Sequence, residues 1–120
     1  MAFALAAALL IGIGIAHSYL GERYILIRLF RQPNLPHLFG NDLFTRRTLR
    51  FAWHLTTIAW FGFATLLLVT VPTSTQGELK ATLSTVIAAT FFTSALFSFA
   101  VSRGKHYSWL VFLAVAILVM

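Results

Sequence analysis

The sequence predicts an all-α integral membrane protein, a bundle of four transmembrane helices with an amphipathic interfacial extension after the first helix. Three observations lead to this class. The 120 residues are 59% hydrophobic and 10% charged, and their mean hydropathy is +0.86, whereas a soluble domain needs roughly a quarter of its residues charged. Four apolar segments follow one another along the chain, and the basic residues gather between them. The last pattern is typical of cytoplasmic membrane loops.

The apolar segments define four expected spans within one transmembrane domain, residues 1–120. They cover about residues 1–20, 51–71, 81–101 and 107–120. A helix needs about 20 residues, at about 1.5 Å each, to cross about 30 Å of hydrocarbon. The first three segments are long enough. The fourth is short, and a tilted bundle, a thinned bilayer or a terminus in the outer leaflet would accommodate it.

A cleaved signal peptide is the competing interpretation of the first segment. Its start, "MAFALAAALL", has no basic residue, and its apolar run is longer than the apolar region of a signal peptide. We therefore expect a retained helix.

The arginines predict the orientation. The connection over about residues 21–50 holds six of the nine basic residues, namely Arg23, Arg28, Arg31, Arg46, Arg47 and Arg50. Arg103 and Lys105 lie between the third and fourth segments, whereas "PTSTQGE" between the second and third has no Lys or Arg. The positive-inside rule places both basic connections in the cytoplasm and both termini outside.

The first connection begins and ends with helical signals. "GERYILIRLFRQP" alternates apolar residues with arginines, so it is expected to continue the first helix into the headgroup zone and to end near Pro33. "QPNLPHLFGND" reads as irregular, with His37 exposed to solvent. Asn41 or Asp42 is expected to cap a helix that runs into the second span. A solvated interfacial segment is the simplest interpretation of these arginines, and an anionic-lipid site is the sharper one.

Two rows of small or hydroxyl side chains indicate how the spans pack. Both rows have four-residue spacing, and they consist of Ala4, Ala8, Gly12 and Ala16 in the first span and Thr90, Ser94, Ser98 and Ser102 in the third. Small side chains allow close approach of a second helix. Hydroxyls bond carbonyls four residues earlier or reach a neighbouring helix. Packing is the favoured role of both rows, with a polar conduit as the alternative.

Three histidines are expected to lie at one depth. His17 lies near the cytoplasmic end of the first span, His54 near that of the second, and His106 at the start of the fourth. At about 1.5 Å per residue, all three imidazoles fall within about 10 Å of the same boundary. Ionisable residues inside spans are costly and commonly functional.

These histidines form a candidate haem or transition-metal site, since imidazole is a common ligand for both. His17, His54, His106 and Glu22 are the candidate metal ligands, with Glu22 either binding metal or orienting an imidazole. Arg46 and Arg50 recur with His54 at four-residue spacing, so their guanidinium groups are candidates for a haem propionate or an anionic headgroup.

Structural, hydrogen-bonded histidines are the alternative, and the spacing favours them. Neither HExxH nor HxxxH occurs. His17 and Glu22 are five residues apart, which separates them by about 140° on an ideal helix. Gly21, four residues after His17, indicates close packing instead. No set of nucleophile, base and carboxylate is evident, so hydrolysis is not expected and no catalytic residue is assigned.

The stretches "AHSYLGERY" and "RFAWHLTTIAW" resemble segments of uncharacterised small bacterial integral membrane proteins with four helices. The resemblance covers most of the chain. It implies a multi-pass protein of the bacterial inner membrane, which with the predicted orientation has both termini in the periplasm, and it implies no activity.

Two function classes follow. The first is a module that binds haem or a transition metal near the cytoplasmic face. The second is a non-catalytic accessory subunit or a homo-oligomeric scaffold, whose small-residue row packs against partner helices. The expected partners are the lipid bilayer, anionic lipid at the arginines, and a second copy or another membrane subunit. The net charge of +6 does not indicate nucleic acid, because the basic residues lie beside apolar spans.

Overall fold

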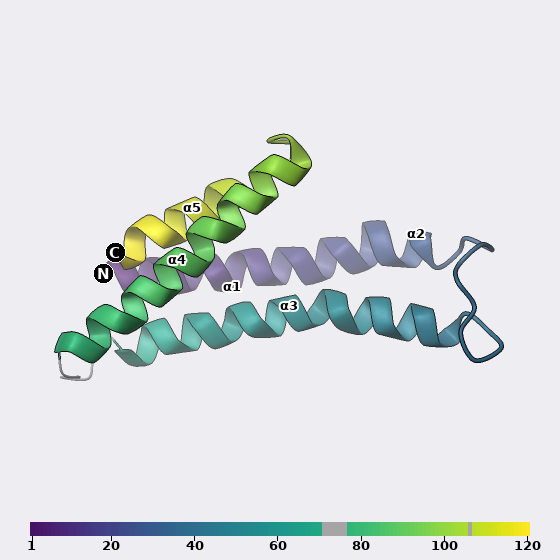
Figure 1. Cartoon of the computed structure of the whole chain (residues 1–120), viewed down its shortest axis with the longest axis horizontal. Coiled ribbons are helices and arrows are strands. Elements are labelled where there is room, and N and C mark those ends of the chain that lie inside the picture. Colours follow the sequence, from purple (N-terminus) through teal and green to yellow (C-terminus); the bar gives the residue numbers. More distant parts are fainter. Residues whose placement is uncertain (71–76, 106) are drawn as a thin grey trace. The chain divides into compact units, whose positions relative to one another are not determined.

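The chain is helical in a computed structural model that describes residues 1–70, 77–105 and 107–120 (Figure 1). Its elements are α1 (Ala2–Leu20), the π-helix η1 (Gly21–Leu26), α2 (Ile27–Leu29), α3 (Leu43–Thr70), α4 (Gly77–Ser102) and α5 (Ser108–Val119). Within the described ranges the sole β-type pairing is an isolated bridge between Leu38 and Asn41. The all-α prediction is confirmed.

Among the described residues, three helical runs are long and apolar enough to cross a membrane: Ala2–Leu29, Leu43–Val69 and Gly77–Ala100. The fourth apolar segment forms α5, which has 12 residues and is shorter than a usual span. Many large apolar side chains are exposed, among them Ile58, Phe97 and Ile117, each at 64% or more. Lipid is the solvent in which such a surface is stable.

The first helix continues beyond residue 20, as the apolar and arginine pattern predicts. η1 and α2 follow α1 without a break, so the helical run ends at Leu29, four residues before Pro33. A π-helix pairs each N–H with the carbonyl five residues earlier, which inserts an extra residue into the turn. Gly21 opens this turn and is buried.

The start of α3 confirms the predicted cap. Oδ1 of Asn41 accepts a hydrogen bond from the Leu43 amide at 2.9 Å, and the Asp42 carbonyl accepts the first helical bond from Arg46. The Asp42 carboxylate accepts a second bond from Nε of Arg46 at 2.8 Å. This bond lowers the pKa of Asp42 below its usual value. A paired anion at a helix N-terminus also complements the helix dipole, so α3 begins well before the apolar span.

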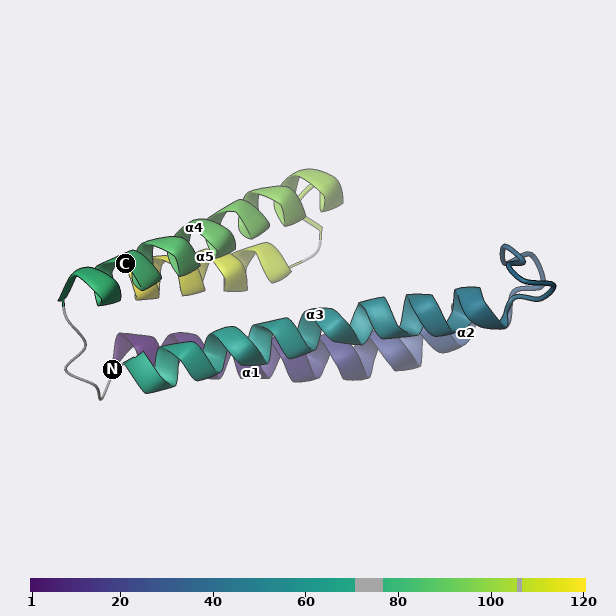
Figure 2. The same cartoon turned by 60° about the horizontal axis from the view of Figure 1, so that its bottom comes forward.

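The described residues divide into two compact units, which are treated separately below. One is Gly14–Trp60, here called the polar hairpin, in which the end of α1, η1 and α2 run antiparallel to the first half of α3 (Figures 1 and 2). The other comprises Met1–Ile13 and Phe61–Met120. Within it, α4 and α5 lie side by side and antiparallel, and this pair is here called the apolar hairpin.

The apolar hairpin is packed around Phe91, which is 1% exposed. Its ring lies 5.9 Å from that of Phe112 on α5 and 5.4 Å from that of Phe63 on α3. Val115 is fully buried in the same unit. The hydroxyls of Ser98 and Ser108 are 2.7 Å apart and join the two helices at their connected ends.

The hydroxyl row on α4 takes both roles expected of it. Thr90 donates to the Val86 carbonyl and Ser94 to the Thr90 carbonyl, each at 2.8 Å, whereas Ser98 reaches α5. The side chain of Ser102 lies outside the described residues. Packing therefore accounts for the described part of the row.

The small-residue row of α1 faces outward. Ala4, Ala8, Gly12 and Ala16 are all exposed, and among the described residues no atom outside the adjacent backbone of α1 lies within 4 Å of a Cβ built at Gly12. The buried side chains of the same helix are instead Ala6, Ala7 and Leu10. The side chains of this row are therefore not part of the described core.

Candidate functional site

His54 lies at the centre of the polar hairpin and uses both ring nitrogens. Its Nδ1 is 2.9 Å from Oγ of Ser18, and its Nε2 is 3.3 Å from Oε2 of Glu22. Ser18 and Glu22 are four residues apart on one helical run, so they lie on the same face. Because an ionised carboxylate only accepts hydrogen bonds, Nε2 of His54 is the donor to Glu22.

Arg50 also contacts Glu22, from a position one turn nearer to the start of α3 than His54. Its Nη2 is 2.8 Å from Oε1 of Glu22, and its Nε donates to Oε2 at 3.2 Å. A guanidinium and a carboxylate paired through two atoms each have a defined relative orientation. Arg50 and His54 are themselves four residues apart on α3. Two pairs with four-residue spacing therefore face each other across the hairpin.

Thr57 is the last residue of this network along α3. Its hydroxyl is 2.8 Å from Oγ of Ser18 and donates to the Gly14 carbonyl at 3.4 Å. Thr57 is 6% exposed, and it is the one buried polar side chain in the described part of the chain. No buried side-chain nitrogen or oxygen among the described residues lacks a partner. Hydrogen bonds offset the cost of burying these groups in an apolar environment.

His17 takes part in a separate aromatic cluster. Its ring stacks on that of Trp53, with centroids 4.7 Å apart and planes 3° apart, and meets the edge of Trp60 at 5.0 Å. Its Nε2 lies 3.3 Å from the Trp53 carbonyl, and the Trp53 indole donates to the His17 carbonyl at 3.1 Å. The two backbones are thus linked reciprocally.

Gly21 allows this approach. A Cβ at Gly21 would overlap the indole ring of Trp53. The close packing predicted at Gly21 is therefore confirmed, and its neighbour is the tryptophan.

Two of the four candidate metal ligands are in contact with each other in the described structure. His54 and Glu22 come together, with the carboxylate orienting the imidazole, whereas His17 bonds a different set of partners. His106 lies outside the described residues. No group of three or more His, Cys, Asp or Glu side chains in the described ranges is arranged to hold a metal ion.

Both candidate propionate-binding arginines are bonded within the hairpin. Arg50 pairs with Glu22. Arg46 pairs with Asp42 and also donates to the Phe30 carbonyl. A haem propionate or headgroup would compete with these bonds for the guanidinium groups.

The other arginines of this unit are exposed. Arg23 and Arg28 lie 5.9 and 5.7 Å from the ring centroid of Tyr24. Together with Arg31 and Arg47 they form no ion pair with any carboxylate in the described segments. These four residues, Arg23, Arg28, Arg31 and Arg47, are called the arginine surface below.

The sequence analysis missed Ser18, Thr57 and the role of Trp53. Gly14, Ser18 and Glu22 recur at four-residue spacing, opposite Arg50 and His54, and this signal was available in the sequence. A polar row on one span predicts a polar row on its neighbour, because unpaired polar groups are costly in lipid.

The structure also corrects the expectation that no nucleophile, base and carboxylate come together. Ser18, His54 and Glu22 have that order. However, Oγ of Ser18 is shared with Thr57, and Ser18 lies inside α1, where amide groups bond carbonyls four residues earlier. Acyl transfer requires free donors for an oxyanion. The arrangement therefore suits hydrogen bonding between helices better than nucleophilic catalysis.

In comparisons with protein families, curated proteins and solved structures, no match to this chain was found.

Proposed function

We propose that this chain is a non-catalytic accessory subunit or homo-oligomeric scaffold in the bacterial inner membrane. The observation that carries the proposal is the outward-facing row of Ala4, Ala8, Gly12 and Ala16. Small residues let helix backbones approach closely, and in lipid such packing drives association because the hydrophobic effect between helices is absent. A small-residue row that is exposed in the described structure is suited to a helix of a second copy or of a partner subunit.

The hydrogen bonds of the histidines support the non-catalytic role. Both nitrogens of His54 and Nε2 of His17 bond groups of the polar hairpin. A substrate or ligand would have to displace those bonds. Hydrogen bonds between helices stabilise a membrane bundle by about 0.6 kcal/mol on average, so a structural role is sufficient reason for burying these imidazoles.

The proposed topology has four spans with both termini in the periplasm. The three long helices and the exposed arginine surface support it. α5 would be the fourth span, and its 12 residues cover about 18 Å, so a tilted bundle, a thinned bilayer or a terminus in the outer leaflet would have to accommodate it. The arginine surface would then lie at the cytoplasmic headgroups and attract anionic lipid.

Gly12→Leu tests the proposed association. The leucine has room in the isolated chain but obstructs a helix packed on the row, so we expect a smaller oligomer, or loss of a partner, in mild detergent. Gly62→Leu is the matched control: Gly62 is exposed on α3 with nothing within 4 Å, and its four-residue neighbours are Ile58 and Leu66. An unchanged oligomer size in Gly12→Leu, with no co-purifying subunit lost, would contradict the proposal.

A haem or transition-metal site at His17 and His54 is the second candidate. The contact of the Glu22 carboxylate with His54 favours it, because carboxylates commonly orient metal-binding imidazoles. A Soret band or stoichiometric metal in the purified protein, lost in His54→Ala and His17→Ala and on acidification, would establish it. A colourless, metal-free protein would favour the scaffold.

A further inference from the structure

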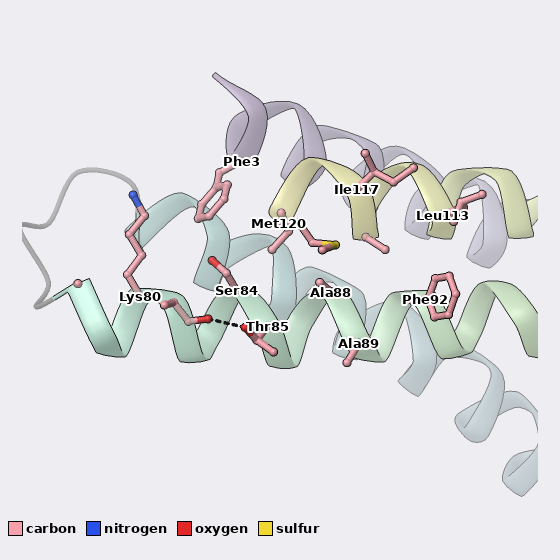
Figure 3. Close-up of a pocket in the computed structure, with 14 residues that line it drawn as sticks. Phe3, Lys80, Ser84, Thr85, Ala88, Ala89, Phe92, Leu113, Ile117 and Met120 are labelled. Carbon is pink, nitrogen blue, oxygen red and sulfur yellow. Dashed lines mark hydrogen bonds between the residues drawn. The ribbon is translucent and has the colours of Figure 1, made fainter.

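An apolar groove lies in the unit formed by Met1–Ile13 and Phe61–Met120 (Figure 3). Its volume is about 970 Å³, at the upper end of the range for pockets that bind small molecules. One face of α4 forms one wall, with small side chains at Ala81, Ser84 and Ala88. α5 contributes a second wall, with Leu113 and Ile117.

The groove is polar at one end and apolar at the other. Lys80 lies at the end near the start of α4, with its Nζ 5.5 Å from the ring centroid of Phe3. The hydroxyls of Ser84 and Thr85 come next, and Thr85 donates to the Ala81 carbonyl at 2.9 Å. Phe92 and Leu113 lie at the far end. A ligand for this groove therefore carries an anionic head and an apolar tail.

Lys80 is available to such a head. It is exposed, and within the ranges 1–70, 77–105 and 107–120 no carboxylate forms an ion pair with it, including Glu78 two residues earlier. The positive end of the α4 dipole lies at the same place, since Gly77 begins the helix and also lines the groove.

The length of the groove suits an acyl chain. Lys80 and Phe92 are twelve residues apart, which is about 18 Å along α4, close to the roughly 15 Å of hydrocarbon in one leaflet. A single lipid tail is also thinner than a helix, whose diameter is about 10 Å.

We propose that this groove binds one acyl chain of an anionic phospholipid, whose phosphate meets the Lys80 ammonium group. The residues that line the groove belong to a different unit from the arginine surface, which lies in the polar hairpin. Lys80 selects the headgroup charge, while the alanine wall of α4 makes room for the tail.

Photochemical labelling of the full-length protein in vesicles tests the proposal. The probes are phosphatidylglycerol and phosphatidylcholine, each carrying a diazirine on the acyl chain, in vesicles of phosphatidylcholine with a minor share of phosphatidylglycerol. We expect label on Leu113 and Ile117 in preference to Leu96 and Phe97, which are exposed on α4 outside the groove. The phosphatidylglycerol probe should label the groove about fivefold more than the phosphatidylcholine probe, the factor expected for one Lys near the headgroups.

Two matched pairs of variants separate this site from general lipid contact. Lys80→Gln should abolish the preference between probes, whereas Lys105→Gln, which changes the other lysine of the chain, should retain it. Ala88→Leu fills the groove and should reduce labelling by both probes, whereas Ala100→Leu, exposed on α4 outside the groove, should not.

The lysine pair decides the question even where Ala88→Leu fails to fold, since Lys80 is exposed. If Lys80→Gln and Lys105→Gln change the preference for the phosphatidylglycerol probe equally, the proposal is wrong. Label spread evenly over exposed apolar residues would also overturn it, as would a larger oligomer in wild type than in Ala88→Leu, because that outcome assigns the groove to a second copy.

Discussion

The polar hairpin and the apolar hairpin hold pairs of helices together in different ways. In the polar hairpin, side chains of Ser18, Glu22, Arg50, His54 and Thr57 bond one another across the contact. In the apolar hairpin, Phe91 and Phe112 pack in a contact with one described hydroxyl bond between helices. Directional bonds define which residues of two helices meet. In the unit that contains the apolar hairpin, packing leaves a groove beside α4.

This contrast predicts different responses to mutation. In a helix contact made of packed rings, removing one ring should lower the free energy of unfolding strongly. In a contact made of connected hydrogen bonds, removing one side chain should lower the free energy of unfolding by less. The effects of two such removals should not be additive.

Phe91→Ala should have the largest effect. Phe91 is 1% exposed between Phe63 and Phe112, and replacing a buried Phe by Ala costs about 3–5 kcal/mol in soluble proteins through lost transfer energy and the cavity left behind. The cavity part persists in detergent. Thermal unfolding measures the loss, with Phe97→Ala as control because Phe97 is 70% exposed. Equal melting temperatures for the two variants would show that Phe91 does not anchor the apolar hairpin.

Gly21→Ala should come next, in the polar hairpin. The added methyl would overlap the Trp53 indole, and overpacking of this kind costs about 1–3 kcal/mol. The melting temperature should fall, and a second change, Trp53→Ala, should make the two substitutions less than additive because it removes the overlap. Gly62→Ala is the control, because no described side chain or neighbouring helix lies within 4 Å of its added methyl, and it should not lower the melting temperature. A neutral Gly21→Ala would refute the close approach of α3 to η1.

Acidification should have the smallest effect, at the start of α3. The hydrogen bond from Arg46 lowers the pKa of Asp42, so this carboxylate stabilises the fold at pH values above the unfolded pKa of about 3.9. That stabilisation is lost as the pH falls through the lower pKa of the folded state. In thermal scans from neutral to acid pH, the melting temperature should fall slightly less in Asp42→Asn than in wild type. An identical fall of the melting temperature in both proteins would contradict a stabilising ion pair between Asp42 and Arg46.

The sequence predicts the helices well because their signals are local. Length and apolar composition predict the long helices, and the spacing of Asn41 from Leu43 predicts the cap of α3. The faces that pack are harder to predict. α1 is apolar all round, so hydrophobicity does not mark the side that is buried. The row containing Gly12 is predicted to face a helix of the bundle or of a second copy, and in the described structure it is exposed.

The candidate site is predicted only in part for a related reason. An ionisable residue stands out in an apolar span, so His54 is easily found and its contact with Glu22 follows from their shared depth. Ser18 does not stand out, because a hydroxyl in a helix commonly bonds its own backbone. The π-helix at Gly21 is equally hidden, and the buried glycine at its start lies against the Trp53 indole.

A double-mutant cycle on Ser18 and His54 tests most directly whether His54 is a structural hydrogen-bonding residue. The measurement is the free energy of unfolding in detergent for wild type, Ser18→Ala, His54→Ala and the double variant, with His37→Ala, exposed in the loop, replacing His54→Ala in a control cycle. We expect a coupling of about 0.6–1.7 kcal/mol between Ser18 and His54, and additivity between Ser18 and His37. Additive losses in both cycles would contradict the account, because Ser18 and His54 would then stabilise the polar hairpin independently.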